Sequence, residues 1–419
     1  MLEKIVKAVL SEKFLLKVFD KVCGLLRKII RRLDVVFSFL PIAIARRVIR
    51  INDRRIAYMT NSFNYTCNPK YICEQLLESG EDYDIVWVTD SIKKKRESYP
   101  PDVKLVQIGT VKCFYYVYSA RVWVSNGVDF SNYFKKKKGQ VKIQTMHGSL
   151  GIKRLDNAVL ARNKRGFFGR RVVRRESRDT DLVITNSLFE ENVFRSVFWK
   201  NTPMKRLGHA RTDILLHSTD LQRRYLRQRI CARYGIPQDR KIVLYGPTHR
   251  TGLTEDDLNL DFYALIDALQ QRFGEKYVVL LRLHNRNAMK LKVSADGERV
   301  FNVTDYPDIQ ELMMITDVAI TDYSSWIYDF VETHKYGFIY ATDLERYNNL
   351  TGLYYKLEDT PFPVAYNNEQ MMENVRNFDP ERYEERVKAF LEDKQAVDDG
   401  HSAQRIMEEI NRILEEGHV

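Results

Sequence analysis

The stretch Val318-Ala-Ile-Thr-Asp-Tyr-Ser-Ser-Trp-Ile-Tyr-Asp329 combines a buried strand with the start of a helix. The residues from Asp317, immediately before this stretch, to Ile320 predict a short apolar strand that ends abruptly in polar residues. Hydroxyl groups at a helix start cap free backbone N–H groups, and those N–H groups and the helix dipole also form an anion site. Two interpretations of the turn are therefore open, a plain helix cap or a phosphate site. The polar residues of the turn are Thr321, Asp322, Ser324 and Ser325.

Length, composition and charge limit the possible classes of protein. A chain of 419 residues with 44% hydrophobic residues is too long for one core, which predicts two domains. The net charge of +11 would suit a nucleic-acid-binding protein. Residues 1–55, however, hold 14 basic and 5 acidic side chains, a net charge of +9, so the rest of the chain carries only +2 of the total of +11. This distribution argues against nucleic acid as a partner.

The five cysteines, Cys23, Cys67, Cys73, Cys113 and Cys231, are scattered and odd in number. Their spacing matches neither a disulfide framework nor a metal site, and it is typical of reduced thiols in a cytosolic protein. Because the sequence has no evident cluster of metal ligands, we expect neither a metal nor another cofactor.

Residues 1–54 interleave aliphatic and basic side chains at helical spacing. The longest run without a charge, Val35 to Ala45, is interrupted by Pro41 and is shorter than the roughly 20 residues that span a bilayer. A basic amphipathic helix suits the surface of an anionic membrane, although a helix packed on the protein's own core has the same pattern. We therefore predict a membrane-associating helical segment at 1–54, which would place the protein peripherally at the cytoplasmic face of the cell membrane.

From residue 55 onward, short β-rich runs alternate with helical runs, which predicts α/β architecture with parallel sheets covered by helices. In the first half we expect strands at 56–60, 85–88, 103–106, 121–125, 141–145 and 182–185, and helices at 69–77, 111–119 and 187–197. In the second half we expect strands at 241–245, 277–281, 300–303, 317–320 and 338–340, and helices at 220–234, 260–273 and 309–315. The predicted domains are 55–205 and 206–380, followed by a helical tail at 381–419.

His147 follows one of the predicted strands, in the loop Gln144-Thr-Met-His-Gly-Ser-Leu-Gly-Ile-Lys-Arg154. Parallel sheets bind ligands at the carboxyl ends of their strands, and histidine exchanges protons near neutral pH. A catalytic histidine and a structural loop histidine both fit this position, and we favour the catalytic role. The loop residues predicted to face an acceptor are Gly148, Ser149, Lys153 and Arg154.

Two basic runs lie in the same half, Lys135 to Lys138 and Lys164-Arg-Gly-Phe-Phe-Gly-Arg-Arg-Val-Val-Arg-Arg175. Arg and Lys neutralise phosphate, so the second run suits a polyanionic acceptor or lipid head groups. A solvated helix face explains the second run nearly as well, and the first run is typical of a solvated loop.

Polar residues follow three predicted strands of the second half. Arg250 ends the segment after 241–245, Arg282 and His284 follow 277–281, and the turn at 321–325 follows 317–320. Cations and helix-start donors that converge on one sheet edge are what a diphosphate requires. For Asp322 a helix cap, and for Asp329 an internal salt bridge, remain alternatives to a role in binding. The predicted donor site comprises Gly246, Thr248, Arg250, Arg282, Thr321, Asp322, Ser324, Ser325 and Asp329.

Taken in order, these segments resemble the CDP-glycerol glycerophosphotransferase family, which makes teichoic-acid-like polymers and some capsules. The resemblance covers about residues 56–360, and Ile320-Thr-Asp-Tyr-Ser-Ser is its most specific part. The other matching segments are Asn68-Pro-Lys-Tyr-Ile, Thr145-Met-His-Gly-Ser, Thr185-Asn-Ser, Phe194-Arg-Ser-Val-Phe, Gly208-His-Ala-Arg-Thr-Asp, Tyr245-Gly-Pro-Thr-His-Arg, Leu281-Arg-Leu-His and Tyr340-Ala-Thr-Asp-Leu. The sequence departs from the family pattern at Leu150, where the family usually has Pro, and at His249, where it usually has Trp.

The resemblance implies a GT-B arrangement, in which two Rossmann-like domains face each other across a cleft and the second holds the nucleotide donor. It implies transfer of glycerol phosphate, or a related polyol phosphate, from a CDP-activated donor to a lipid-linked or polymeric acceptor, with release of CMP. His147 and His284 are the two histidines that it implicates in catalysis. Other classes stay open: a UDP-sugar-dependent GT-B glycosyltransferase, or a non-catalytic membrane-bound or RNA-binding module on a GT-B scaffold.

Overall fold

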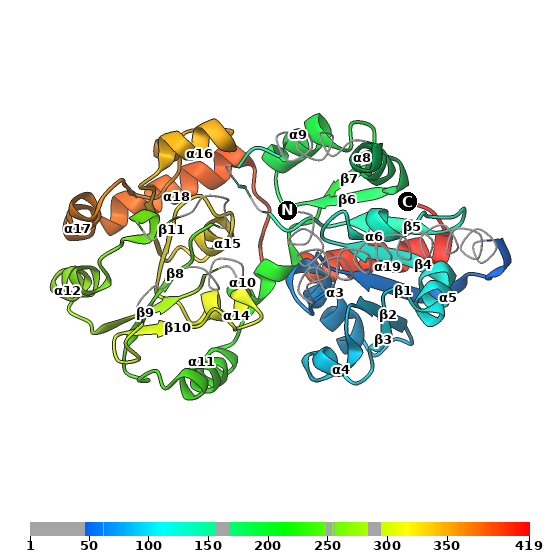
Figure 1. The fold of residues 1–419 in the computed structure, drawn as a ribbon, viewed down its shortest axis with the longest axis horizontal. Helices are drawn as coiled ribbons and strands as arrows, with labels where there is room; N and C mark the ends of the chain where they lie inside the picture. Colours follow the sequence, from blue (N-terminus) through cyan, green and yellow to red (C-terminus); the bar gives the residue numbers. More distant parts are fainter. Residues whose placement is uncertain are drawn as a thin grey trace, which may run out of the picture.

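The computed structural model describes residues 47–419 apart from 62, 149, 152, 156–166, 249–253, 255 and 284–294. The helical segment predicted at 1–54 lies almost entirely outside the described residues. Two lobes stand side by side, each built around one sheet (Figure 1). Within the described ranges, no helix has both the length and the apolar character that crossing a membrane requires.

The first sheet has seven parallel strands in the order β3-β2-β1-β4-β5-β6-β7. Because all pairs are parallel, the carboxyl ends of the strands share one edge of the sheet. The strands are β1 (Asn52–Met59), β2 (Asp84–Thr89), β3 (Lys104–Gln107), β4 (Ala120–Ser125), β5 (Val141–Gln144), β6 (Leu182–Thr185) and β7 (Met204–Arg206). The helices of this part are α3 (Cys67–Glu78), α4 (Ile92–Lys95), α5 (Val111–Ser119), α6 (Asp129–Tyr133), α8 (Phe167–Asp179) and α9 (Leu188–Val197).

The second sheet has six parallel strands in the order β10-β9-β8-β11-β12-β13. The strands are β8 (Lys241–Tyr245), β9 (Tyr277–Leu281), β10 (Val300–Asn302), β11 (Val318–Thr321), β12 (Tyr336–Tyr340) and β13 (Val364–Ala365). The helices are α10 (Asp213–His217), α11 (Asp220–Tyr234), α12 (Phe262–Phe273), α14 (Ile309–Met314), α15 (Trp326–Val331), α16 (Leu344–Leu350), α17 (Asn368–Arg376) and α18 (Pro380–Lys394).

Strand β11 is apolar because it lies between β8 and β12 and is buried along its whole length. A central strand of a parallel sheet has both faces covered by helices, so its sequence is continuously apolar rather than alternating. All six residues of α15, which follows directly, are buried as well. The turn between β11 and α15 is therefore held rigidly on both sides, as a binding turn requires.

Capping residues explain why several predicted helix ends agree with the structure. Thr219 forms a reciprocal capping box with Gln222 at the start of α11, and Gly235 ends the helix in the left-handed conformation with φ 71°. Asp261 caps α12, which ends at Gly274 with φ 77°. These signals are local, so the sequence alone is enough to read them.

The two carboxyl-terminal helices pack against different domains. Helix α18 contributes Val387 and Phe390 to the core of the second domain. Helix α19 (Ser402–Glu416) instead contributes Ile406 and Ile410 to the core of the first domain, and it lies in the first lobe in Figure 1. The segment between these helices crosses from one domain to the other. Within the predicted tail at 381–419, the sequence indicates which helix faces are buried but not which core they meet.

Candidate active site

His147 lies just after β5, at the edge of the first sheet where its strands end. The loop that carries it bends sharply, with positive φ angles at Met146 (49°) and Leu150 (27°). Leu150 is buried in the core of the second domain, and its carbonyl oxygen accepts a hydrogen bond from the hydroxyl group of Tyr355. The loop after His147 therefore reaches from the first domain into the second.

The hydrogen bonding of the His147 ring fixes its tautomer. The Nδ1 atom lies 2.6 Å from the carbonyl oxygen of Asn126, and a carbonyl oxygen can only accept, so Nδ1 carries the hydrogen. In the neutral ring Nε2 is then a free base. Desolvation by the surrounding protein lowers the pKa of His147 below its ordinary value. The nearby cations Arg211 and Lys153 lower it further. A neutral ring whose Nε2 carries no hydrogen is the form that a general base needs.

Asn68 holds the backbone of the His147 loop in place. Its buried side-chain amide donates hydrogen bonds to the carbonyl oxygens of Thr145 (3.0 Å) and Met146 (3.3 Å). Its side-chain oxygen accepts a hydrogen bond from the backbone N–H of Arg211 at 3.1 Å. The sequence marks Asn68 only as part of the family segment Asn68-Pro-Lys-Tyr-Ile. Its position at the start of α3 does not indicate these partners, which are distant in sequence.

The Ser324–Ser325 turn faces the His147 loop across the domain boundary. A Cβ atom added to Gly148 would lie 4.0 Å from the Oγ atom of Ser325. Ser325 occupies the cap position of α15, but its side chain makes no capping hydrogen bond. Both serines are half-buried. The simple helix-cap interpretation therefore fails for Ser325, and its hydroxyl group lies where the two domains meet.

The neighbouring strand ends of the second sheet are linked by polar contacts. Asp322 accepts hydrogen bonds through Oδ1 from the backbone N–H groups of Thr248 (2.8 Å) and Tyr323 (2.6 Å). The carbonyl oxygen of Gly246 accepts from Thr321 Oγ1 at 2.6 Å and from Trp326 Nε1 at 2.9 Å. Asp322 and Thr321 are buried, so these contacts assign them to shaping the turn.

Gly246 leaves no room for a side chain, which gives a stability prediction. A Cβ atom there would lie 3.0 Å from Trp326 Nε1 and 3.2 Å from its Cε2, in a closely packed region. We expect Gly246→Ala to lower the free energy of unfolding by about 1–3 kcal/mol through overpacking. Denaturant unfolding measures this, with Gly148→Ala as the control because, among the described residues, the nearest atom to its new Cβ would lie 4.0 Å away. Equal stability of the two variants would contradict the packing argument.

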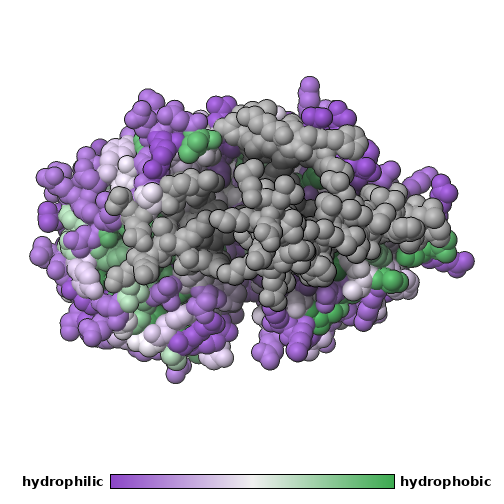
Figure 2. Space-filling model, in the orientation of Figure 1, coloured by the Kyte–Doolittle hydropathy of each residue, from purple (hydrophilic) through white to green (hydrophobic). Residues whose placement is uncertain are grey.

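Arg282 follows β9 and lines a cleft of about 1330 Å³ between the domains. Burial lowers the pKa of its guanidinium, and its Nε atom finds no hydrogen-bond acceptor among the described residues. Figure 2 shows the hollow between the lobes at the lower edge of the view, with hydrophilic residues on both sides. The lining includes Asn61, Asn64, Tyr65, Lys95 and Tyr99 from the first domain and Arg229, Arg233, Asp305 and Tyr306 from the second.

Asn126 joins this cleft to the His147 loop. Its carbonyl oxygen accepts from His147 Nδ1, and its side-chain Oδ1 accepts from the backbone N–H of Asn61 at 3.0 Å. Asn61 in turn lines the cleft. The base and the cleft are therefore connected parts of one interdomain face, and no sequence motif pointed to Asn126.

Asp329 does not face this opening, contrary to its predicted place in the donor site. Its carboxylate is buried and forms a two-point ion pair with Arg211, with Nε–Oδ2 at 2.8 Å and Nη2–Oδ1 at 2.9 Å. Gln310 also donates to Oδ2 at 2.8 Å. Both oxygens are thus occupied by protein groups, which agrees with the internal salt bridge that the sequence left open.

The remaining predicted residues fall into two groups. Lys153 forms an antiparallel bridge with Leu353, and the backbone N–H of Arg154 donates to the carbonyl oxygen of Gly352 at 3.2 Å, so this segment pairs with the second domain. Ser149, Arg250 and His284 lie outside the described residues. In the described part of the chain, no three His, Cys, Asp or Glu side chains gather as a metal site would need; that the protein needs no cofactor stays a prediction.

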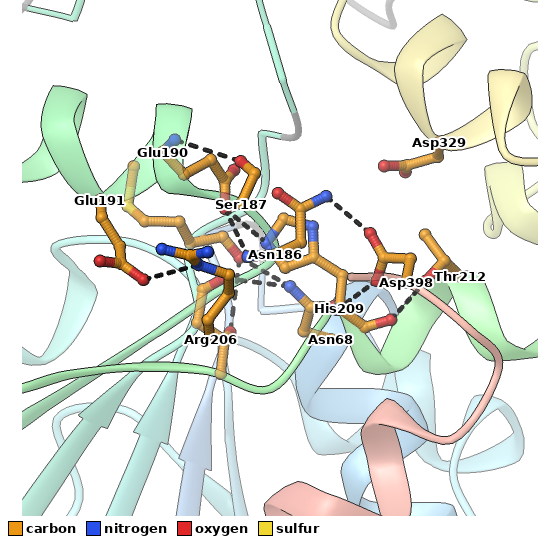
Figure 3. Close-up of polar contacts among 12 residues, drawn as sticks. Asn68, Asn186, Ser187, Glu190, Glu191, Arg206, His209, Thr212, Asp329 and Asp398 are labelled. Atoms are coloured by element: carbon orange, nitrogen blue, oxygen red, sulfur yellow. Dashed lines mark hydrogen bonds and ion pairs between the residues drawn. The ribbon is translucent and has the colours of Figure 1, made fainter. Parts of the chain in front are cut away.

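Residues of the family segments Thr185-Asn-Ser and Gly208-His-Ala-Arg-Thr-Asp bind the segment between α18 and α19, which crosses from the second domain to the first. Asp398 accepts hydrogen bonds from Asn186 Nδ2 (2.6 Å), the backbone N–H of His209 (2.7 Å) and Thr212 Oγ1 (3.0 Å), as Figure 3 shows. The ring of His209 is buried, with Nε2 3.1 Å from Glu190 Oε2. These contacts give Asn186 and His209 a structural role.

Two facing parallel sheets, with a histidine loop from one against a serine turn of the other, define a GT-B-type protein. The chain belongs to the CDP-glycerol:poly(glycerophosphate) glycerophosphotransferase family, whose model matches residues 42–412. The family resemblance of the sequence is thereby confirmed.

Curated relatives and a solved structure agree with this assignment. The chain is 30% identical over 369 residues to a teichoic acid poly(glycerol phosphate) polymerase of Staphylococcus epidermidis, a match that covers 84% of this chain and 50% of the relative. It is 28% identical over 376 residues to a protein of the same name from Bacillus spizizenii, covering 86% of this chain and 92% of that one. The chain thus spans about half the length of the first relative and most of the second.

The fold also matches a solved structure of the wall teichoic acid polymerase TagF, a histidine-to-asparagine variant soaked with CDPG. The TM-score is 0.75 at 26% identity, and the match covers 94% of this chain and 98% of that chain. The predicted GT-B-type fold with two Rossmann-like domains is therefore confirmed.

Proposed function

We propose that this chain transfers glycerol phosphate from CDP-glycerol to an acceptor hydroxyl group and releases CMP. The observation that carries the proposal is the neutral His147, whose Nε2 is a free base and whose loop meets the Ser324–Ser325 turn across the domain boundary. Family membership and the names of the two polymerases support glycerol phosphate as the transferred group.

In the proposed reaction, Nε2 of His147 takes the proton of the acceptor hydroxyl as its oxygen attacks the phosphorus that carries glycerol. A new phosphodiester bond forms, the P–O bond to CMP breaks, and CMP leaves with the bonding electron pair. The base lies on one domain and the proposed donor site on the other. The base can therefore act on the acceptor hydroxyl only when both substrates are bound between the domains.

Charge on the transferring phosphoryl group and on departing CMP needs fixed donors. We assign this task to Arg282, whose buried Nε lacks an acceptor among the described residues, and to the hydroxyl and N–H groups of the Ser324–Ser325 turn. Arg250 and His284, in the segments that follow β8 and β9, complete the proposed donor site. Thr321, Asp322, Gly246 and Thr248 shape it through the contacts described above.

The acceptor in this proposal is a growing teichoic-acid-like polymer, lipid-linked at its start, at the cytoplasmic face of the membrane. Lys153 and Arg154 follow the His147 loop and supply positive charge beside it, which suits a polyanionic acceptor. The basic segment at 1–54 would hold the enzyme peripherally at an anionic membrane surface.

A donor screen tests the proposed function. With CDP-glycerol and a lipid-linked glycerol phosphate acceptor, we expect CMP release together with an acceptor mass gain of one or more glycerol phosphate units. CDP-ribitol and UDP-sugars serve as competing donors, and omission of the acceptor controls for donor hydrolysis. Release of UDP from a UDP-sugar, without CMP release from CDP-glycerol, would make the proposal wrong.

A further inference from the structure

A second recess, of about 260 Å³, lies in the first domain beside α8, and the described residues that line it are all basic. Helix α8 lies at the periphery of the first lobe in Figure 1. We call this recess the arginine groove. Its lining residues are Lys135, Arg170, Arg171, Arg174, Arg175 and Arg178.

A fully buried carboxylate sets which face of α8 points outward. Glu176 pairs with Lys142 of β5 at 2.6 Å, and neither side chain is exposed to solvent. The same carboxylate accepts hydrogen bonds from Ser131 Oγ at 2.6 Å and from Gln144 Nε2 at 2.9 Å. Because a buried charge is costly unless it is fully paired, this network fixes the rotation of α8 about its axis. The network therefore also fixes the direction in which the arginines on the opposite face of α8 point.

The positive charge of the groove is hardly neutralised within the described part of the chain. Arg178 pairs with Asp179 at 2.8 Å, whereas no described carboxylate forms an ion pair with Arg170, Arg171 or Arg174, all of which are exposed. Burial and the neighbouring Arg171 lower the pKa of Arg175, as expected where like charges are held together. A bound anion would relieve this repulsion.

We infer that the arginine groove binds a phosphodiester chain, namely the polyanionic acceptor polymer at a distance from its reacting end. The inference rests on the proposed function and extends it by giving the acceptor a second contact. Guanidinium groups bind phosphate by planar, two-point hydrogen bonds, and a row of them along one helix matches the repeated charge of such a chain. Strand β5 connects the two sites, because it carries Lys142, the partner of Glu176 on α8, and leads into the His147 loop.

From Arg170 to Asp179, the composition of the exposed face of α8 favours a polymer over a lipid surface. A helix that lies on a membrane needs an exposed apolar side beside its basic one. From Arg170 to Asp179, the exposed residues of α8 are all arginines, while Val172 and Val173 are half-buried against the protein. This part of the helix therefore offers charge without an apolar face to insert.

The groove can be tested by binding without catalysis. We expect the triple variant Arg170→Gln, Arg171→Gln, Arg174→Gln of the full chain to bind soluble poly(glycerol phosphate) at least about tenfold more weakly than the wild type near physiological salt. The dependence of affinity on salt should also become shallower, because fewer counterions are released. The control is Arg224→Gln, Arg376→Gln, Arg382→Gln, which removes the same charge from exposed helix positions of the second domain.

The outcomes separate the alternatives. Weaker polymer binding by the groove variant, with unchanged binding by the control, supports the inference. An equal loss of polymer affinity in both variants would show that only the net charge of the protein matters. Unchanged polymer binding with weaker binding to phosphatidylglycerol vesicles would show that the groove binds lipid. Either result overturns the inference. Circular dichroism confirms that both variants are folded.

The experiments distinguish an error in the inference about the arginine groove from an error in the proposed function. If the wild type releases CMP in the donor screen, but replacing the groove arginines does not change its affinity for the polymer, only the inference about the groove is wrong. If the wild type binds polymer through these arginines but releases no CMP from any CDP-polyol, only the proposed reaction is wrong.

Discussion

Replacing His147 by alanine is expected to slow CMP release from CDP-glycerol by about 10²–10⁴-fold, the usual contribution of a general base. The imidazole is the free base that the geometry places beside the serine turn, since Nδ1 is committed to the carbonyl oxygen of Asn126. The loss should appear in kcat, because the ring acts on the reacting proton rather than holding the donor. Single-turnover measurements at saturating donor isolate this step.

The pH profile provides an independent test of the same residue. A general base works only when it is unprotonated, and the environment of His147 lowers its pKa below the ordinary value of 6.5. Activity of the wild type should therefore persist as the pH falls through 6.5 and decline only at lower pH. In His147→Ala this acid limb should disappear from the residual rate.

His418→Ala is the matched control, because this histidine lies near the chain terminus with an exposed side chain. Its turnover should equal that of the wild type. Near-normal turnover of His147→Ala would remove the residue from the mechanism, and an acid limb that survives in that variant would assign the titration to another group.

Much of the fold could be predicted because its signals are local. The predicted bounds 111–119, 182–185, 220–234, 241–245 and 277–281 agree with α5, β6, α11, β8 and β9 to the residue. The three strands are short, continuously apolar runs, and Thr110 and Thr219 cap the starts of the two helices. Strand β7 was missed because its three residues include Lys205 and Arg206 and show no apolar run.

The site could be predicted only in part, because a sequence shows which residues follow strands but not which partners they meet. His147, Ser325 and Arg282 were found as polar residues at strand ends, and all three lie at the interdomain face. Asn126 was missed, since its role depends on two backbone groups far away in sequence. Asp329 follows a strand end too, yet it faces Arg211 because the next helix turns it inward.

Asp329 closes a chain of contacts that runs between the two halves of the candidate site. Asn68 binds the carbonyl oxygens of the His147 loop and accepts from the backbone of Arg211. The side chain of Arg211 pairs with Asp329, which lies one turn along α15 from Ser325. This ion pair therefore helps to set the position of the base relative to the serine turn.

Breaking this pair should be strongly destabilising. In Asp329→Ala the guanidinium of Arg211 would stay buried without a counter-charge, which costs about 3–5 kcal/mol of unfolding free energy. The control is Asp267→Ala, which removes one partner of the exposed Arg299–Asp267 pair and should cost about 1 kcal/mol or less. Urea unfolding followed by circular dichroism measures both. The double variant Arg211→Met, Asp329→Leu should recover much of the lost stability, because no charge is then left buried. A loss in Asp329→Ala no larger than in the control would show that the pair does not hold the domains together.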